Sequence, residues 1–310
     1  MSVTDRIASL TPEQRALLEK LVEKQQKAAR TFTPPPIPRV TGPAGEGDWP
    51  LSLDQERFWF MEQLYPEGAG LNISAATRMY GRLSLPALAA ALSEVVRRHA
   101  AWRTSFPALG GVPVQRVHAP SPQRLSLIDL VALPAARREP EAFRLVGEDV
   151  AAAFDLEHGP LVRSSLVRMG EEDHLCLLTV HHLATDFLSF QIAWSELAVL
   201  YEARASGRLQ TSQALPEPPV HYPDFAVWQR GWLQGEVLDG LVGWWRERLA
   251  GFPLNLDLPT DRPRPAVPRM RGGRRQVAAS EATSELLRRY ARGEGATLFM
   301  LVLAGMAALL

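Results

Sequence analysis

The stretch LCLLTVHHLATD at residues 175–186 decides most of the fold. Both faces of its first six residues are apolar, as expected for a central strand that is covered on each side. A segment rich in apolar residues follows from Leu188 to Tyr201 and predicts a long helix. His181 and His182 therefore stand where a buried strand opens into a loop that leads to a helix.

Strand and helix patterns alternate on the N-terminal side of this stretch. Ser84 and Pro86 mark the start of one helix, because serine is a favoured N-cap and proline suits the first helical turn. Strands are predicted over Ile73–Tyr80, Val112–Val117, Leu161–Met169 and Leu175–Val180, and helices over Leu85 to about His99, around Phe143–Phe154 and over Leu188–Tyr201. This alternation predicts an α/β fold with mixed layers, and no repeat period indicates a solenoid.

The composition excludes several classes of protein. The chain has 310 residues, of which 46% are hydrophobic and 22% are charged, as in an ordinary soluble globular protein. The 34 basic residues equal the 34 acidic ones, so no net field attracts a polyanion, and nucleic-acid binding is not expected. Cys176 is the single cysteine, which excludes a disulfide framework and a multi-cysteine metal site.

The two ends of the chain lead to expectations about location and completeness. The N-terminus lacks the pattern of a secretory signal, which predicts a cytoplasmic protein. The longest apolar run, Leu298–Leu310, has thirteen residues, fewer than the roughly 18 of a membrane span, so no membrane association is expected. No polar residue, glycine or proline follows Leu310, which predicts a cut through a buried helix.

Residues 1–30 are predicted to be a helical extension. Thr11, Pro12 and Gln14 form a capping-box start, from which a helix should run to about Arg30. This extension is either a frayed segment or a docking helix for an upstream assembly-line protein. Residues 31–48 are rich in proline and glycine and predict a linker with nothing to bury, so the folded body is expected to begin near Trp49.

Three interpretations compete for the histidine pair. Side chains alternate along a strand, so His181 and His182 must point to opposite sides, and at most one can face a given pocket. Both can be core residues that donate to backbone carbonyls. A metal site at His182 and Asp186 is disfavoured, because no further ligand stands at helical spacing. In the third interpretation, a neutral imidazole takes a proton from a nucleophile while Asp186 holds the loop.

A resemblance to a known family narrows these alternatives. Residues 181–187, HHLATDF, resemble the His-His-x-x-x-Asp-Gly motif of nonribosomal peptide synthetase condensation domains, which belong to the chloramphenicol acetyltransferase-like acyltransferases. Further ordered stretches are similar to other motifs of the family: Leu51–Trp59 with Ser52, Gln55, Arg57 and Trp59, then Arg98–Phe106, Phe154–Leu156, Gly159–Leu161, Tyr222–Trp228 and Leu258–Pro263.

The resemblance covers the N-terminal part of such a domain, from Trp49 to Leu310. It implies an α+β two-layer sandwich, in which two acetyltransferase-like halves form a V around a tunnel. Residues 49–230 then make the N-terminal acetyltransferase-like subdomain, and residues 231–310 make a connector and an incomplete C-terminal subdomain.

The same resemblance implies amide formation in a nonribosomal peptide or hybrid polyketide/peptide assembly line. A donor acyl group on the phosphopantetheine arm of one carrier protein is attacked by the amine of an acceptor on another, and the domain binds no cofactor of its own. His182 matches the active-site histidine, His181 the first histidine and Asp186 the structural aspartate. Imidazole can act as a base or orient a neutral amine, and the sequence leaves both roles open.

Asp186 is expected to be buried, where a carboxylate normally needs a cationic partner. Arg57 is the first candidate for this ion pair and Arg103 the second, because both lie in motif-like stretches. Phe187 stands where the family has glycine, and it is expected to line the tunnel together with Ser189. With His182 retained, this departure indicates a specialised active member.

Two alternatives remain from the sequence. One is a noncatalytic condensation-like module that recruits carrier proteins or an accessory enzyme. The other is a stand-alone acyltransferase that uses coenzyme A and an alcohol. A hydroxyl acceptor in place of the amine, and the activity of these 310 residues alone, are left open.

Overall fold

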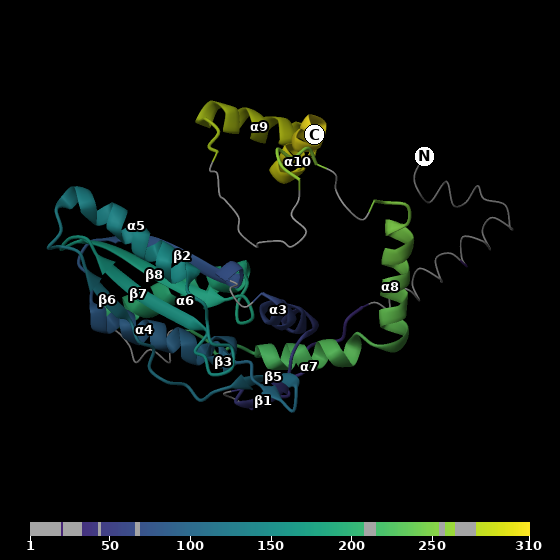
Figure 1. Cartoon of the computed structure of the whole chain (residues 1–310), viewed down its shortest axis with the longest axis horizontal. Helices are drawn as coiled ribbons and strands as arrows, with labels where there is room; N and C mark the ends of the chain where they lie inside the picture. Colours follow the sequence, from purple (N-terminus) through teal and green to yellow (C-terminus); the bar gives the residue numbers. More distant parts are fainter. Residues whose placement is uncertain are drawn as a thin grey trace, which may run out of the picture. The chain divides into compact units, whose positions relative to one another are not determined.

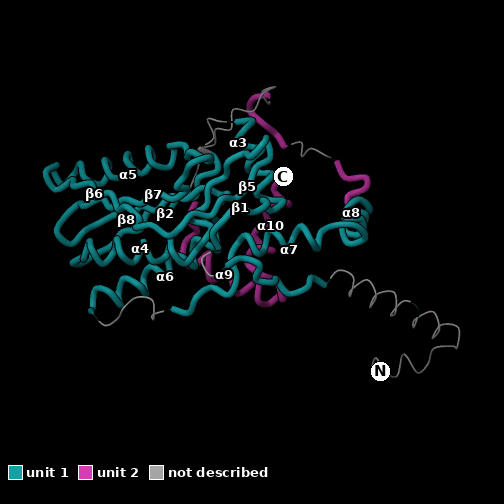
Figure 2. The backbone as a smooth tube through the Cα atoms, turned by 90° about the horizontal axis from the view of Figure 1, so that it is seen from below, with its two compact units in different colours: residues 1–248 teal, residues 249–310 magenta. Residues whose placement is uncertain are grey.

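The computed structural model describes Lys20 and residues 33–42, 45–65, 69–207, 215–253, 258–263 and 277–310. The chain divides into two units, residues 1–248 and residues 249–310, coloured separately in Figure 2. The helix predicted from Pro12 to about Arg30 lies outside the described residues except for Lys20, which is helical.

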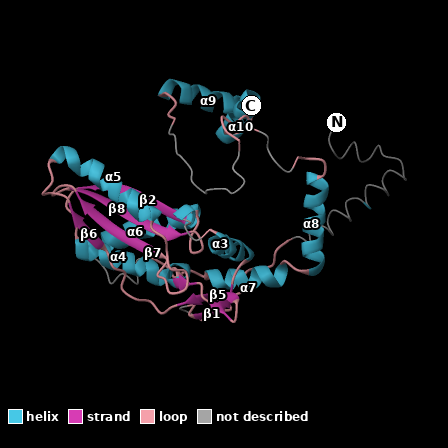
Figure 3. Cartoon of the chain, in the orientation of Figure 1, coloured by secondary structure: helices cyan, strands magenta, loops and turns pink. Residues whose placement is uncertain are grey.

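The larger sheet of the first unit places the predicted central strand in its interior. Its order is β2 (Asn72–Tyr80), β8 (Asp173–His181), β7 (Val162–Arg168) and β6 (Ser126–Asp129). The pairs β2–β8 and β7–β8 are antiparallel, and β6–β7 is parallel (Figure 3). The register sets Asn72 opposite His181, so the histidine pair lies where β2 begins and β8 ends.

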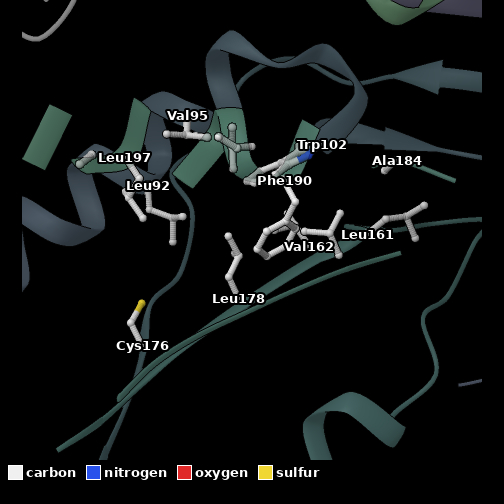
Figure 4. Packing of buried hydrophobic residues seen from close by; sticks show 14 of the residues in the cluster. Leu92, Val95, Trp102, Leu161, Val162, Cys176, Leu178, Ala184, Phe190 and Leu197 are labelled. Carbon is white, nitrogen blue, oxygen red and sulfur yellow. The ribbon is translucent and has the colours of Figure 1, made fainter. Parts of the chain in front are cut away.

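Helices cover both faces of this sheet (Figure 1). Helices α4 (Leu85–Arg98) and α6 (Phe187–Ala205) pack on one face, where Cys176 and Leu178 point into the main core (Figure 4). Helix α5 (Ala135–Ala151) packs on the other face, against Val167, Met169 and Leu175. Because neighbouring strand residues face opposite sides, an apolar run such as β8 is buried on both. The mixed α/β class predicted from the sequence is confirmed.

A smaller sheet and several helices complete the first unit. The sheet has the order β1 (Gly47–Pro50), β5 (Val112–Val117) and β3 (Thr104–Ser105), and β4 (Ala108–Leu109) also pairs with β5. Further elements with described bounds are α3 (Leu53–Leu64), the short 3-10 helices η1 (Ala69–Leu71) and η2 (Ala100–Arg103), α7 (Tyr222–Trp232) and α8 (Gly235–Leu249), which ends at the boundary with the second unit.

Helix α5 differs from its prediction, which placed it around Phe143–Phe154. It starts at Ala135, directly after Pro134, and contains Pro140 near its N-terminal end. A proline at the sixth position of a helix removes the backbone hydrogen bond to the residue four positions earlier and normally disfavours a helix, so the sequence pattern does not extend the helix back through Pro140.

The segment predicted as a linker contributes to the folded body. The carboxylate of Asp224, fully buried in α7, accepts hydrogen bonds from the backbone N–H groups of Val40 (2.8 Å) and Thr41 (2.7 Å). Burial alone would raise the pKa of Asp224, but these donors and the N–H of His221 hold it below its usual value. The expectation that residues 31–48 bury nothing is wrong at Thr41, which is 6% exposed, because Asp224 satisfies its backbone.

The second unit contains α9 (Glu281–Gly293) and α10 (Leu298–Leu309), the latter capped by the hydroxyl of Thr297. No residue of α10 is buried, although the helix is apolar on all sides. Among the described helices, none is long and apolar enough to cross a membrane by itself. Helices α9 and α10, bent by 101° at the break between them, meet that test as a pair on length and composition only.

Candidate active site

A pocket of about 530 Å³ lies beside the end of β8, within the first unit. Its walls come from α3, the junction of α4 and η2, the turn after β8, the start of α6, and α7 with the loop before it. The lining residues are Asp54, Gln55, Arg57, Phe58, His99, Ala100, Ala101, Trp102, His182, Leu183, Ala184, Thr185, Asp186, Ser189, Ile192, Pro218, Val220, His221 and Tyr222.

His182 is half-buried and lines this pocket. Its imidazole stacks on the ring of Phe58, with centroids 4.5 Å apart and planes inclined by 26°. Its backbone N–H donates to the carbonyl of Leu71 at 2.8 Å. Its Nδ1 is buried, with no hydrogen-bond partner among the described residues. The ring is therefore held by stacking and by its backbone.

His181 has a different environment, as strand alternation predicts. Its side chain does not line the pocket and is only 1% exposed. Its Nε2 lies 3.1 Å from a carboxylate oxygen of Glu62, and its Nδ1 accepts the backbone N–H of Leu183 at 3.1 Å. The ring of Phe154 meets it edge-on, with centroids 6.1 Å apart. The prediction that at most one of the two histidines can face a given pocket is confirmed.

Asp186 is the N-cap of α6, and its side chain is exposed to solvent. One carboxylate oxygen accepts the backbone N–H of Ser189 at 2.7 Å. The pKa of Asp186 is lowered, mainly by the hydrogen bond from the Ser189 side chain and also by the charge interaction with His182. The carboxylate therefore has the role of a helix cap, which fixes the loop after the histidine pair to α6.

The predicted ion pair between Asp186 and an arginine is wrong. Arg57 pairs with Asp54 at 3.3 Å, three residues earlier on α3, and both side chains are largely exposed. Arg103 donates to the backbone carbonyls of Arg97 and His118. An exposed carboxylate at a helix N-terminus is already stabilised by backbone N–H groups and solvent, so it needs no buried cation.

Phe187 and Ser189 occupy different positions around the pocket. Ser189 lines it, whereas Phe187, the first residue of α6, is 70% exposed and is not among the described lining residues. A helical backbone accepts phenylalanine without strain, so this position does not require the conformational freedom of glycine. A role for Phe187 in the substrate tunnel stays a prediction.

Motif-like residues that are distant in sequence meet beside the turn that follows β8 and begins at His182. We call this segment the histidine turn. Ser52 and Gln55 form a capping box at the start of α3, and the Ser52 hydroxyl lies 3.0 Å from that of Tyr222. The Gln55 side chain donates to the carbonyl of Leu183 at 3.2 Å, and Gln229 accepts the N–H of Leu53 at 2.9 Å. The opening motif thus connects the histidine turn to α7.

His99, which lines the pocket, belongs to a charged cluster that the sequence reasoning missed. The Nε2 of His99 lies 2.9 Å from a carboxylate oxygen of Glu196 on α6, and Arg98 binds both oxygens of Glu196 at 3.0 and 3.1 Å. Burial would raise the pKa of Glu196, but hydrogen bonds from His99 and Arg98 hold it at about 2. The available signal was Glu196 itself, the single charged residue in the segment from Leu188 to Tyr201.

In the part of the chain that the structure describes, no group of three or more histidine, cysteine, aspartate or glutamate residues is arranged to hold a metal ion.

The sequence also gave no sign of Phe58 and Glu62, which contact the two histidines. Phe58 falls within the opening motif-like stretch, whereas Glu62 lies three residues beyond it, and a pattern search gives neither side chain a role.

Comparison with known proteins establishes the family. A family model described as "Condensation domain" matches residues 45–310, so the chain belongs to the condensation-domain family. It is 41% identical over 301 residues to one of the linear gramicidin synthase proteins of Brevibacillus parabrevis, covering 96% of this chain and 4% of that protein. It is 42% identical over 305 residues to the phosphinothricin tripeptide synthetase PhsC of Streptomyces viridochromogenes, covering 98% and 27%.

Two solved structures have the same fold. The X-domain from teicoplanin biosynthesis matches with a TM-score of 0.70 and 29% identity, over 85% of this chain and 56% of that one. The first condensation domain of the CDA synthetase matches with a TM-score of 0.70 and 22% identity, over 85% and 61%. The chain thus spans little more than half of these solved domains. The prediction of a nonribosomal peptide synthetase condensation domain is confirmed at the level of the family.

Proposed function

We propose that this chain supplies the histidine-bearing part of a condensation site that forms an amide. The donor is an acyl thioester on the phosphopantetheine arm of one carrier protein, and the acceptor is an aminoacyl group on a second carrier. The amine nitrogen attacks the thioester carbonyl, the carbon–sulfur bond breaks, and the thiol leaves with a proton that came from the amine. The observation that carries this proposal is the position of His182 in the wall of a 530 Å³ pocket, among residues from three motif-like stretches.

His182 is proposed to move or orient the proton of the attacking amine. An ammonium ion cannot attack a carbonyl, so a nearby imidazole that accepts a proton, or aligns an amine that is already neutral, assists the reaction. Stacking on Phe58 limits rotation of the ring. Asp186 holds the end of the loop as the cap of α6 and interacts electrostatically with His182.

Much of the remaining acceleration is attributed to alignment of the two arms. A thioester is an activated acyl group, and correct placement of two reactants is worth several kcal/mol of the barrier. In this proposal Ser189, Tyr222 and His99, which line the pocket with His182, are candidates to contact the bound arms.

A second candidate function is recruitment without catalysis. The X-domain that matches this chain at 29% identity has also been solved in a complex with OxyB, both from teicoplanin biosynthesis. By analogy, the surface around the pocket would bind a partner enzyme and His182 would have no chemical role.

One experiment separates the two candidates. The complete condensation domain that contains this chain is incubated with an acyl-loaded donor carrier and an aminoacyl-loaded acceptor carrier, and the acceptor is followed by intact-mass spectrometry. Condensation predicts that the acceptor gains the donor acyl group in place of one amine hydrogen, and that this mass increase depends on His182. Recruitment predicts no transfer with either the wild-type protein or His182→Ala.

A further inference from the structure

One face of α3 contacts three consecutive residues, the last residue of β8 and the first two of the turn that follows it. Glu62 meets His181, Phe58 stacks on His182, and Gln55 binds the carbonyl of Leu183. Positions 55, 58 and 62 are three and four residues apart, so they lie on the same side of the helix. This face of α3 therefore sets the conformation of the turn that carries His182.

The hydrogen bonds around His181 assign its protonation state. The backbone N–H of Leu183 donates to Nδ1 at 3.1 Å, so Nδ1 must present a lone pair. The Nε2 atom then carries the proton of the neutral ring and donates it to Glu62, 3.1 Å away. Because His181 is 1% exposed, its ring nitrogens are bound by these two protein groups and not by bulk solvent.

Loss of the Glu62 carboxylate would favour the other tautomer of His181, with the proton on Nδ1 and the lone pair on Nε2. An Nε2–H group without an acceptor is costly in a buried site, and the ring can avoid that cost by moving its proton to Nδ1. A protonated Nδ1 faces the Leu183 N–H, donor against donor. The turn must then shift at Leu183, the residue directly after His182.

We propose that Glu62 is a positioning residue for His182. Its carboxylate selects the Nε2–H tautomer of His181, which keeps the N–H of Leu183 bound and thereby fixes the backbone on both sides of His182. This inference rests on the proposed function, because the importance of His182's position depends on its part in the condensation. The effect of Glu62 on the His181 tautomer does not depend on that function.

The activity test compares three substitutions at this position with a neighbouring control in the complete domain. Glu62→Gln retains a side-chain oxygen that can accept from Nε2, and is expected to keep amide formation close to the wild-type rate. Glu62→Ala and Glu62→Met, the second of which preserves most of the volume, remove the acceptor and should lower the rate on the order of 100-fold, as for a misplaced catalytic group. Gln63→Ala, at an exposed position of the same helix, should have no effect.

The second readout is the nitrogen NMR spectrum of His181 in the 310-residue chain, with His181→Gln used to assign the signals. Wild type and Glu62→Gln should show a protonated Nε2 and an unprotonated Nδ1, and Glu62→Met should lose this pattern. Glu62→Met with both an unchanged His181 spectrum and wild-type activity would overturn the proposal. So would Glu62→Gln with activity as low as Glu62→Met, because the charge and not the acceptor would then matter. Wild-type activity in His182→Ala would instead refute the proposed function, while the NMR result would still decide the tautomer.

Discussion

The two sides of the β8–α6 turn place adjacent histidines in contrasting surroundings. On the buried side, His181 is 1% exposed, and both of its ring nitrogens have partners within the protein. On the pocket side, His182 is half-buried, stacks on Phe58, and has no hydrogen bond to its ring among the described residues. The same residue type is thus bound by two protein groups at position 181 and lines a pocket at position 182. Substitutions on the two sides should separate stability from activity.

The largest expected effect is on the pocket side. In the complete domain, His182→Ala should lower amide formation by roughly a hundredfold or more, the range for loss of a general base. Its cost in stability should be small, about 0.5–1.5 kcal/mol for the lost stacking on Phe58. The rate of amide formation is measured as single-turnover transfer by mass spectrometry. The stability is measured by urea unfolding. Near wild-type transfer would mean that His182 has no chemical role.

On the buried side, a substitution is expected to change stability more than it changes the chemistry. His181→Ala leaves a cavity and removes the partner of both Glu62 and the Leu183 N–H, which should destabilise the first unit by roughly 2–4 kcal/mol. Urea unfolding checks this loss, with Gln63→Ala as the reference. Equal stability of the two variants would show that the His181 environment is not the structural support that we describe.

Asp186 should give a smaller effect than a buried ion pair would. Asp186→Ala removes an N-cap, which costs roughly 0.5–2 kcal/mol and not the 3–5 kcal/mol expected for a buried charge left without its partner.

The pH dependence of stability also tests the assignment of Asp186 as a charged N-cap of α6. The pKa of Asp186 is lowered in the folded protein, so its contribution is present at neutral pH and is lost as the pH falls through the folded-state pKa. In Asp186→Asn, an uncharged N-cap, this part of the acid loss should be absent. A loss of stability identical to that of wild type between neutral and acidic pH would contradict the assignment.

Phe187 is expected to have the smallest effect on stability. Its side chain is 70% exposed at the first position of α6, where glycine costs at most about 1 kcal/mol. If Phe187 lines the tunnel of the complete domain, Phe187→Gly should change the relative rates of short and long acyl donors. Competition between two loaded donor carriers measures this preference, and an unchanged ratio would remove Phe187 from the substrate path.

The sequence predicted the features that depend on local patterns. The apolar run in β8, the helix that follows it and the opposite orientation of His181 and His182 all come from periodicity within one segment. The ion-pair and hydrogen-bond partners of individual side chains could not be predicted from such local patterns. Arg57 is satisfied by Asp54 within its own helix, and Glu62 is 119 residues from His181 in the sequence. Such pairings depend on how α3 packs beside β8, which no local pattern specifies.

The same limit applies to the segment before the folded body. Proline and glycine in residues 31–48 do not reveal that a carboxylate from α7 binds the backbone of Val40 and Thr41. This contact joins segments 183 and 184 residues apart. Composition predicts the local conformation of a segment, whereas its contacts are decided by the rest of the fold.

The central claim is that His182 acts in amide formation while His181 only supports it. The most direct test is single-turnover transfer from a loaded donor carrier to a loaded acceptor carrier by folded wild-type and His182→Ala domains, read as intact mass. We predict acyl transfer by the wild-type domain and a loss of roughly a hundredfold or more in His182→Ala, with the folded state retained. Equal transfer by both proteins would contradict the account.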